Sequence, residues 1–425
     1  MSRPPVLEQP IAADPPPAAS APPRRSGLGG RIVREIVTGG TVAVTVLALV
    51  LALLVGAVVI AASDPAAAAA WRRVTSDPVR ALGASWDAIA DAYGALLRGA
   101  LLEPASVSAA VDGGSIANVF GPISETLVAA TPLILAGLSV TIAFRAGLFN
   151  IGGQGQAMLG AAAGAFVGFH WQLPAALHLT AALLAGVSAG AAWGLIPGFL
   201  KARTGAHEVI TTIMLNYVAV GLVLYLLSKP IFLREGRTDP LSPEVAGSAR
   251  LPQLAGETLR LHLGILVALA VAAAVLWLLR RTTIGFSLRI VSLNEDAART
   301  AGVSVSRAWV LGMVLAGALA GLAGAVEILG TDYALVPSSA ASLGFLGISV
   351  ALLGRATVGG TVLASLLYGA FEAGGVRMQA ATATPFDIVT VIQALTVLFV
   401  AAPQLVRAVF RLRARPIEAA AGRGW

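Results

Sequence analysis

Apolar runs long enough to cross a lipid bilayer recur along most of this 425-residue chain. The run at 41–62, TVAVTVLALVLALLVGAVVIAA, is apolar on all sides, as is typical of a helix that crosses the hydrocarbon with about 20 residues. These runs lack the alternation of transmembrane β-barrel strands. Hydrophobic residues make up 57% of the chain and charged residues 12%, unlike the composition of soluble domains. The sequence therefore predicts an all-α fold, a polytopic membrane helix bundle.

About ten spans are expected, and an even number places both termini on one side of the membrane. The segments that this count assigns to the cytoplasm hold 19 of the 29 basic residues, and the external segments hold 10. Because basic residues are enriched in cytoplasmic loops, both termini are predicted to be cytoplasmic. The expected spans lie at 41–62, 122–144, 156–169, 174–200, 208–227, 262–279, 308–329, 344–354, 358–371 and 386–402.

The spans divide the chain into five parts. The first 40 residues are rich in Pro and Ala and are expected to be disordered, and residues 79–102 have the spacing of an amphipathic helix lying at the outer membrane interface. The predicted parts are a cytoplasmic N-terminal tail (1–40), the first span (41–62), an external segment with the interfacial helix (63–118), a membrane core (119–406) containing a cytoplasmic polar loop (280–307), and a cytoplasmic C-terminal tail (407–425).

Residue types that carry redox, metal or nucleophilic chemistry are scarce. The chain has no cysteine and four scattered histidines, so no disulfide, thiolate metal site or histidine ligand cluster is expected. The net charge of +7 does not indicate nucleic-acid binding, because the basic residues lie beside apolar runs as membrane orientation produces. No base–nucleophile pairing is evident, and catalysis is not expected.

The polar loop at 280–307 lies between two apolar runs and must stay in water. Its stretch SLNEDAARTAG predicts a short helix: Ser292 or Asn294 caps the start, Glu295 and Asp296 suit the positive end of the helix dipole, and Gly302 ends it. This helix has little apolar face to bury. It is either a docking element for a soluble partner or an ordinary solvated loop.

Three polar insertions interrupt membrane-depth sequence, where polar groups are costly, and each is a candidate part of a substrate pathway. They are FRAGLFNIGGQGQ at 144–156, HEVITTIMLNY at 207–217 and the carboxylate of Glu327. A glycine-rich turn, a helix cap and a snorkelling carboxylate are the structural alternatives. The candidate pathway residues are Asn150, Gln154, Gln156, His207, Glu208, Thr211, Thr212, Asn216 and Glu327.

Small residues recur every four positions in three stretches. Glycines at 160–168 and 186–198, and the pair Gly317 and Gly321, make smooth stripes that allow helices to approach closely. The stripes predict a compact bundle and carry no information about cargo.

Taken together, FRAGLFNIGGQGQ, HEVITTIMLNY and RIVSLNEDAARTAGV, with GFLGISVALLGR behind, closely resemble the permease subunits of bacterial ABC importers of the ribose/nucleoside and branched-chain amino-acid class. The resemblance covers residues 123–406, and HEVITTIMLN is most similar to the longer permease of nucleoside and simple-sugar importers. It implies a multi-pass protein of the bacterial inner membrane that moves nucleosides or related sugars by alternating access. It also implies that the polar loop couples the chain to an ATPase through Arg289, Asn294, Glu295, Ala297, Ala298 and Gly302.

The implied partners are a cytoplasmic ABC ATPase with two nucleotide sites, a second homologous permease or a second copy of this chain, and an extracellular substrate-binding lipoprotein. ATP and Mg would bind to the ATPase, since this chain has no GxxxxGK[ST] phosphate loop and needs no cofactor of its own. Two alternatives stay open. One is an ion-gradient-driven secondary transporter that uses Glu208 or Glu327, and the other is a branched-chain amino-acid ABC permease.

Overall fold

The computed structural model describes residues 41–113, 115–256 and 258–411. The tail predicted at 1–40 and residues 412–425 of the predicted C-terminal tail lie outside the described residues. Within the described residues the chain is helical, and its only β-type pairing is an isolated bridge between Gln253 and His262. The prediction of an all-α fold is confirmed.

The helices follow one another with short connections, apart from the irregular segment at 228–263. Their bounds are α2 Thr41–Ser63, α3 Pro65–Trp71, α4 Pro78–Ala100, α5 Pro104–Val111, η1 Ile116–Phe120, α6 Gly121–Arg145, α7 Gly153–His170, α8 Ala175–Thr204, α9 Glu208–Leu227, η2 Gly247–Ala249, α10 Gly264–Arg281, α11 Thr283–Leu293, α12 Glu295–Thr300, α13 Val305–Glu327, η3 Ile328–Asp332, α14 Leu343–Leu353, α15 Val358–Thr382, α16 Asp387–Ala401 and α17 Pro403–Val409.

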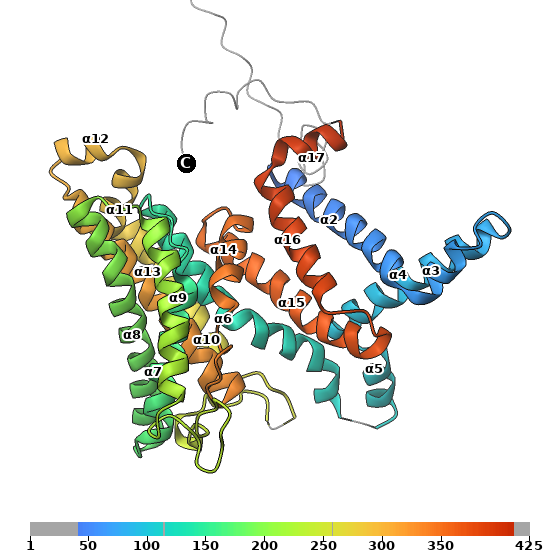
Figure 1. The fold of residues 1–425 in the computed structure, drawn as a ribbon, viewed down its shortest axis with the longest axis horizontal. Coiled ribbons are helices and arrows are strands. Elements are labelled where there is room, and N and C mark those ends of the chain that lie inside the picture. Colours follow the sequence, from blue (N-terminus) through green and yellow to red (C-terminus); the bar gives the residue numbers. More distant parts are fainter. Residues whose placement is uncertain (1–40, 114, 257, 412–425) are drawn as a thin grey trace, which may run out of the picture.

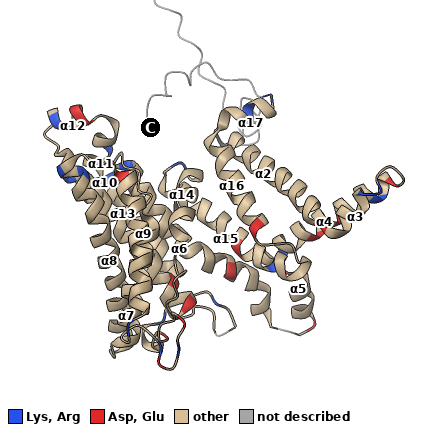
Figure 2. Ribbon diagram, in the orientation of Figure 1, with Lys and Arg blue, Asp and Glu red and all other residues tan. Residues whose placement is uncertain are grey.

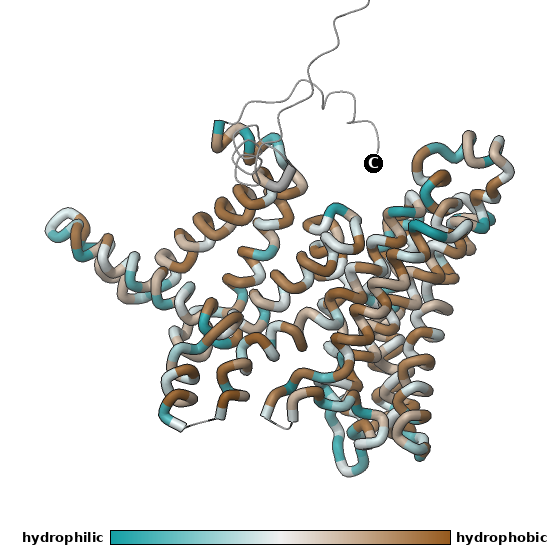
Figure 3. Tube along the Cα trace, turned by 180° about the vertical axis from the view of Figure 1, so that it is seen from behind, coloured by the Kyte–Doolittle hydropathy of each residue, from teal (hydrophilic) through white to brown (hydrophobic). Residues whose placement is uncertain are grey.

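The helices form two groups that α6 and α14 join (Figure 1). One group contains α7, α8, α9, α10 and α13, and the other contains α2, α4, α15 and α16. The α12 and α17 helices lie at the same end of the molecule, and the irregular segment at 228–263 lies at the opposite end of the first group (Figure 1). The hydropathy map shows long apolar helices whose ends and connecting loops are more polar (Figure 3).

A helix forms at each of the ten predicted spans, but fewer helices are long and apolar enough to cross a membrane. Among the described residues six qualify, or seven if the bent pair α16–α17 counts as one span. The α14 helix has 11 residues and is about 16 Å long, short of the roughly 30 Å of the hydrocarbon. The number of about ten complete spans is therefore not confirmed.

Burial explains why α7 lacks the hydropathy of a typical span. It is rich in Gly and Ala and packs between α8 and α13, with most of its residues buried in the protein. A helix surrounded by other helices needs close packing more than an apolar surface. Hydropathy alone therefore does not identify α7 as a span.

The contact between α8 and α13 confirms the close helix approach predicted from the small-residue stripes. A Cβ atom added at Gly190 would lie 2.2 Å from the carbonyl oxygen of Gly317, and one added at Gly194 would lie 2.4 Å from that of Met313. A Cβ at Gly160 would lie 2.2 Å from the carbonyl oxygen of Gly321. Larger residues at these positions would force α7, α8 and α13 apart.

The amphipathic helix predicted in the segment 63–118 is α4. Its C-terminal half is packed into the second helix group, where Leu96 lies against Gly374 of α15. Trp86, in the N-terminal half, is 69% exposed. The helix is therefore anchored at one end, and its other end projects from the bundle together with α3 (Figure 1).

Candidate functional site

A buried network of side-chain amides surrounds the start of α7. The amides of Asn150 and Gln156 are hydrogen bonded to each other, with Asn150 Nδ2 2.9 Å from Gln156 Oε1. Asn216 on α9 accepts from the backbone N–H of Gly155 at 2.9 Å and donates to the carbonyl of Ile151 at 2.9 Å. Each of the three amide side chains is at most 6% exposed. The network therefore ties the loop before α7 to the middle of α9.

The glycines of FRAGLFNIGGQGQ explain why this loop enters the bundle. Gly147 has a φ of +71°, a conformation that L side chains rarely adopt, and it ends α6. Asn150 then accepts the N–H of Gly152 at 3.0 Å, so it caps an otherwise unpaired donor at the start of α7. The polar insertion is thus a helix break whose backbone groups are satisfied inside the protein.

The remaining polar candidates of this region lie around the amide network. Thr212 is buried and donates to the carbonyl of Glu208 at 2.7 Å, and Thr211 is half-buried and donates to the same carbonyl at 3.0 Å. Gln154 is half-buried at the start of α7, in contact with the start of α14 at Gly344. His207 is exposed and begins α9.

Glu208 forms an ion pair that joins α8 to α9. Its Oε2 lies 2.7 Å from Lys201 Nζ, and its Oε1 accepts the backbone N–H of Phe149 at 3.4 Å. The Lys201 ammonium also lies 4.8 Å from the ring centroid of Trp309 on α13. His207 Nδ1 lies 4.0 Å from Glu208 Oε2. One carboxylate therefore links α8, α9 and the loop before α7.

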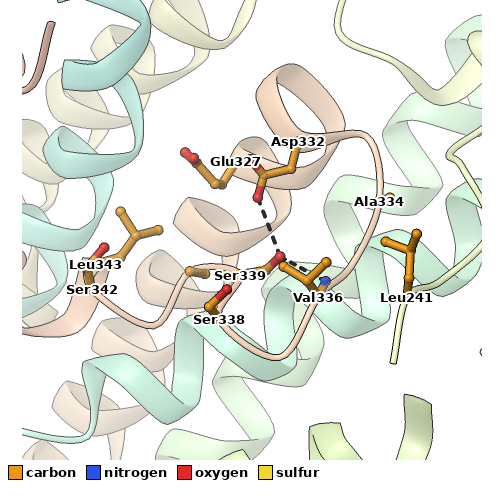
Figure 4. A pocket seen from close by; sticks show the side chains of 10 residues that line it. Leu241, Glu327, Asp332, Ala334, Val336, Ser338, Ser339, Ser342 and Leu343 are labelled. Atoms are coloured by element: carbon orange, nitrogen blue, oxygen red, sulfur yellow. Dashed lines mark hydrogen bonds between the residues drawn. The ribbon is translucent and has the colours of Figure 1, made fainter. Parts of the chain in front are cut away.

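Glu327 faces a cavity of about 420 Å³ at the other end of the first helix group (Figure 4). The cavity is lined by the end of α13, by the loop that follows it, by the start of α14 and by Leu241 of the irregular segment. Glu327 is half-buried and forms no hydrogen bond or ion pair with the described residues. Asp332 is exposed at the mouth of the cavity and accepts from Ser339 at 3.4 Å.

Backbone turns hold the cavity open. The last residues of α13 continue as a single π-helical turn, η3, which ends at Tyr333 with a φ of +56°. Ser339 Oγ accepts the N–H of Val336 at 3.0 Å, and Ser242 Oγ accepts the N–H of Leu335 at 2.8 Å. π-helical turns are frequent at functional sites because they move side chains out of the regular helical order.

The polar side chains that line the cavity are hydrogen-bond acceptors, and no Lys or Arg is among its described lining residues. Two carboxylates and the hydroxyls of Ser338, Ser339 and Ser342 line it together with apolar side chains such as Leu343. Carboxylates accept hydrogen bonds from hydroxyl and N–H groups, and the serines can donate or accept. Among the described residues no group of three or more His, Cys, Asp or Glu residues could hold a metal ion.

The polar loop forms two helices, α11 and α12, rather than one. Of the two predicted caps, Asn294 begins α12: its Oδ1 accepts the N–H groups of Asp296 at 2.9 Å and Ala297 at 3.0 Å. Gly302 follows the helix with a φ of +76°. Arg299 pairs with Asp296 at 2.9 Å, so the short helix is stabilised on its own surface.

The α12 helix is buried at one residue only. Ala298 is 0% exposed, whereas Glu295 and Ala297 are exposed and Arg289, on α11, is exposed with its Nε 3.3 Å from the carbonyl of Gly285. Basic residues gather around α10, α11 and α12 at this end of the molecule (Figure 2).

Three features of these sites were not predicted. Leu293, the last residue of α11, is 84% exposed, which is unusual for leucine and was hidden within a polar stretch. Lys201 carried no predicted site role, although it lies in the last turn of α8, seven residues before Glu208. Asp332 and Ser339 became part of the cavity only because η3 turns the chain back on itself.

The candidates therefore form three separate regions. The amide network and the Lys201–Glu208 pair lie close together, because Phe149, Asn150 and Gly152 belong to one loop. Glu327 lies apart from them, at the end of α13 that is farther from α12, and α12 with its flanking residues is the third region.

Comparison with known proteins connects these regions to one family. The family model described as "Branched-chain amino acid transport system / permease component" matches residues 123–401. The chain is 41% identical over 294 residues to the guanosine ABC transporter permease protein NupP of Bacillus subtilis (strain 168), covering 68% of this chain and 84% of NupP. It is 39% identical over 296 residues to the glucose ABC transporter permease protein TsgB13 of Haloferax volcanii, covering 67% of this chain and 77% of TsgB13.

A second Bacillus subtilis protein, the guanosine ABC transporter permease protein NupQ, is 26% identical over 255 residues, covering 58% of this chain and 79% of NupQ. No solved structure matches the chain. The predicted resemblance to ABC importer permeases is confirmed by these matches. With its apolar spanning helices and a family match from the start of α6 to the end of α16, this multi-pass membrane protein belongs to the branched-chain amino acid transport system permease family.

Proposed function

We propose that this chain is the transmembrane permease subunit of an ATP-driven ABC importer for nucleosides or related simple sugars. The observation that carries the proposal is the 41% identity to NupP, whose name gives guanosine as its cargo, over 84% of that protein. The chain itself transfers no bonds and provides a path that opens alternately to the two sides of the membrane.

The chemistry of the cavity at Glu327 supports this cargo class over branched-chain amino acids. Nucleosides and sugars present hydroxyl and N–H donors, which the Glu327 and Asp332 carboxylates and the serine hydroxyls can accept. An amino acid carries a carboxylate as well as an ammonium group, and none of the described residues that line the cavity is a Lys or Arg that could pair with that carboxylate. The nearby Arg260 is paired with Glu125 at 3.1 Å and is therefore less available to a cargo carboxylate.

The topology that fits this function has both termini in the cytoplasm of a bacterial inner membrane. The start of α2 and the α17 helix lie at the end of the molecule where α12 lies, which supports this arrangement (Figure 1). Arg145, Lys201, Arg203, Arg280 and Arg281 end their helices at that side, as the positive-inside rule predicts. The ten passes would then include α7 and α15 as enclosed helices and α14 as a short, incomplete one.

The partners are a cytoplasmic ABC ATPase that binds ATP and Mg at two sites, a second permease and an extracellular substrate-binding lipoprotein. The existence of NupP and NupQ in one organism favours a paralogous second permease, with a homodimer as the alternative. The ATPase would receive α12 and the exposed Leu293, with Arg289, Asn294, Glu295, Ala297, Ala298 and Gly302 forming or shaping the contact.

A route for mechanical coupling runs from the docking helix to the bundle. Ser292, at the end of α11, touches Gly147, because a Cβ at Gly147 would lie 3.0 Å from the Ser292 Cα. The loop from Gly147 then reaches Glu208 through Phe149 and the amide network through Asn150. A displacement of α11 and α12 by the ATPase would therefore move this loop against α7, α8 and α9.

The candidate pathway residues divide by exposure into two proposed roles. Gln154, His207, Thr211 and Glu327 are at least partly exposed and would contact cargo or water during transport. Asn150, Gln156, Glu208, Thr212 and Asn216 are buried with their polar groups paired, and they would shape the wall of the path behind these residues.

Uptake of radiolabelled guanosine, ribose, glucose and leucine would test the proposal, in cells that carry this chain with its partner ATPase or with an ATPase lacking its phosphate-loop lysine. Nucleoside or sugar uptake that needs the intact ATPase is expected. If leucine is the only compound taken up, the proposal is wrong and the chain is an amino-acid permease.

The coupling contact has its own test. Glu295→Lys and Gly302→Val are expected to leave the protein in the membrane and to abolish most ATP-dependent uptake, because one reverses a docking charge and the other strains a left-handed backbone position. Uptake at the wild-type rate in both variants would remove α12 from the coupling role.

One observation favours a second candidate function. Glu327 faces the cavity without a hydrogen-bonded or ion-paired partner among the described residues, which is a feature of ion and proton sites in secondary transporters. Uptake that persists without ATP hydrolysis and stops when the ion gradient is dissipated would establish that function. Glu208 does not support it equally, since Lys201 already neutralises its charge.

A further inference from the structure

A long apolar groove lies between α2 and the arm formed by α3 and α4, outside the region that matches the family. The groove has a volume of about 1060 Å³ and is lined by Val50, Leu54 and Val58 of α2, by Trp71 of α3, and by Trp86 and Tyr93 of α4, among others. The transport function proposed above does not use these residues. Val58 is 68% exposed and Trp86 is 69% exposed, so the groove is open along one side.

The walls of the groove are tied together by specific contacts. Trp71 Nε1 donates to Ser85 Oγ at 2.9 Å, which joins α3 to α4, and the Tyr93 hydroxyl donates to the carbonyl of Leu53 at 2.5 Å, which joins α4 to α2. Asp64 and Asp77 cap α3 and α4. Because all three helices are held in place, the groove is a built feature of the fold and not a gap between unrelated segments.

Three arginines lie where the arm turns, next to the end of the groove. Arg72 and Arg73 directly follow Trp71, and Arg80 is in the first turn of α4. All three are exposed, and within the described residues none of them forms an ion pair. Asp77 is the one acidic residue between them, and its carboxylate accepts the backbone N–H of Arg80 at 3.0 Å. The turn therefore carries a net positive charge (Figure 2).

We propose that the groove binds an anionic phospholipid, with an acyl chain between α2 and α4 and the phosphate held by Arg72, Arg73 and Arg80. An apolar channel that ends in unpaired guanidinium groups matches the two parts of such a lipid. Guanidinium groups bind phosphate oxygens through paired N–H donors, and basic residues near a membrane surface attract anionic headgroups. Trp71 and Trp86 have the amphipathic rings that favour the level of the headgroups.

The lipid would connect the arm to the rest of the protein. In the N-terminal half of α4 only Ala81 is buried, whereas in its C-terminal half Ala92, Ala95, Leu96 and Ala100 are buried. An acyl chain in the groove would cover apolar surface of α2 and α4 together. Binding would then stabilise the arm, and anionic lipid would raise the thermal stability of the chain more than zwitterionic lipid does.

Native mass spectrometry and thermal unfolding of the full-length chain, purified with its partner subunits into nanodiscs, would test the proposal. The probes are phosphatidylglycerol and phosphatidylcholine. Wild-type protein is expected to retain phosphatidylglycerol preferentially. Arg72→Gln/Arg73→Gln/Arg80→Gln is expected to weaken this binding about a hundredfold, and Arg80→Gln alone about fivefold.

Arg98→Gln is the matched control, since Arg98 is also an exposed arginine of α4 and lies 18 residues, or five helical turns, beyond Arg80 on the same face. It is expected to leave lipid binding unchanged. Equal binding of the two lipids by the wild-type protein, or equal effects of Arg80→Gln and Arg98→Gln, would overturn the proposal.

A second variant tests the groove without touching the arginines. Ala57→Trp fills the groove, and it is expected to remove the stabilisation by phosphatidylglycerol while leaving stability in phosphatidylcholine unchanged. Since the chain has no cysteine, Val58→Cys introduces a single thiol into the groove. Efficient disulfide formation between two copies through that thiol would show that the groove is a protein interface and would exclude the lipid.

Discussion

The amide network around Asn216 and the cavity at Glu327 are both built from polar side chains in apolar helices, yet their hydrogen bonding differs. Asn150, Gln156 and Asn216 bond to one another or to backbone groups and are almost fully buried. Glu327 is half-buried, faces a cavity of about 420 Å³ and has no hydrogen-bonded or ion-paired partner within the described residues. The first region resembles a closed structural junction, and the second an open site.

The difference shows how a polar residue in a membrane helix should be interpreted. Burial of a polar group without a partner costs free energy, so a polar residue persists either because it is paired or because function requires it. Pairing accounts for Asn216 but not for Glu327. Variants in the amide network should therefore change mainly stability, and variants in the cavity should change mainly transport.

The largest effect is expected from breaking the ion pair between Lys201 and Glu208. Lys201→Met leaves a poorly solvated carboxylate and should lower the free energy of unfolding by about 3 kcal/mol, as for other buried pairs that lose one member. Unfolding in detergent measures this loss. Lys229→Met, which loses only a contact with the exposed Tyr225 ring, should have little effect. Lys201→Met/Glu208→Gln should recover most of the stability, and failure to recover would mean that the charge pair is not the cause.

A somewhat smaller loss of stability is expected from Asn216→Ala. The change leaves the N–H of Gly155 and the carbonyl of Ile151 without their partner, which should cost about 2 kcal/mol. Asn118→Ala is the control, because Asn118 is exposed and lies outside the bundle core. If Asn216→Ala keeps wild-type stability and only transport falls, the network belongs to the cargo path and the comparison between the two regions fails.

Glu327→Gln should leave stability unchanged and reduce transport. Loss of the carboxyl group that cargo would contact should lower uptake about tenfold, equivalent to about 1.4 kcal/mol. Glu372→Gln is a matched control, because Glu372 accepts from Gln393 at 3.1 Å and does not line the cavity. A fall in stability without a specific fall in uptake would place Glu327 with the structural residues.

The smallest effect near neutral pH is expected from His262, which precedes α10 and should make stability depend on pH. Burial and the nearby Arg260 lower the pKa of His262 from 6.5 to about 4. Its Nδ1 accepts the N–H of Gly264 at 3.1 Å, and its Nε2 has no hydrogen-bond partner among the described residues. Between pH 6.5 and 4 the unfolded chain binds a proton that the folded chain does not bind, so stability should fall as the pH is lowered through this range.

His262→Gln should flatten that part of the curve of unfolding temperature against pH, and the difference between the two curves isolates this histidine. Identical curves for the variant and the wild-type protein would show that His262 can bind a proton in the folded state without cost.

The helices themselves were largely predictable from local sequence. A helix was expected at each of the ten places where one forms in the membrane part of the chain, and the glycine stripes of α7, α8 and α13 predicted their close approach. The number of spans was not predictable in the same way. The α14 helix is apolar but too short for a complete span, and α7 differs from the lipid-facing spans through the helices that surround it.

The sequence predicted which residues belong to the candidate sites, but it did not predict which of these residues contact one another. Asn150 and Asn216 attract attention because amides are unusual in apolar runs, yet nothing in their spacing says that one loop and the middle of α9 meet. The cavity depended on a π-helical turn at the end of α13, which brings Asp332 and Ser339 opposite Glu327.

The sequence by itself determined that this chain is a helical membrane protein with a capped polar helix on one side, and its motifs determined the family. These properties depend on the solvent: hydrocarbon requires apolar, hydrogen-bonded helices, and water requires the polar loop. Only the tertiary structure decided which polar groups are paired and which face a cavity. Pairing depends on contacts between residues far apart in the chain, such as Gly155 with Asn216, and local patterns carry no information about such contacts.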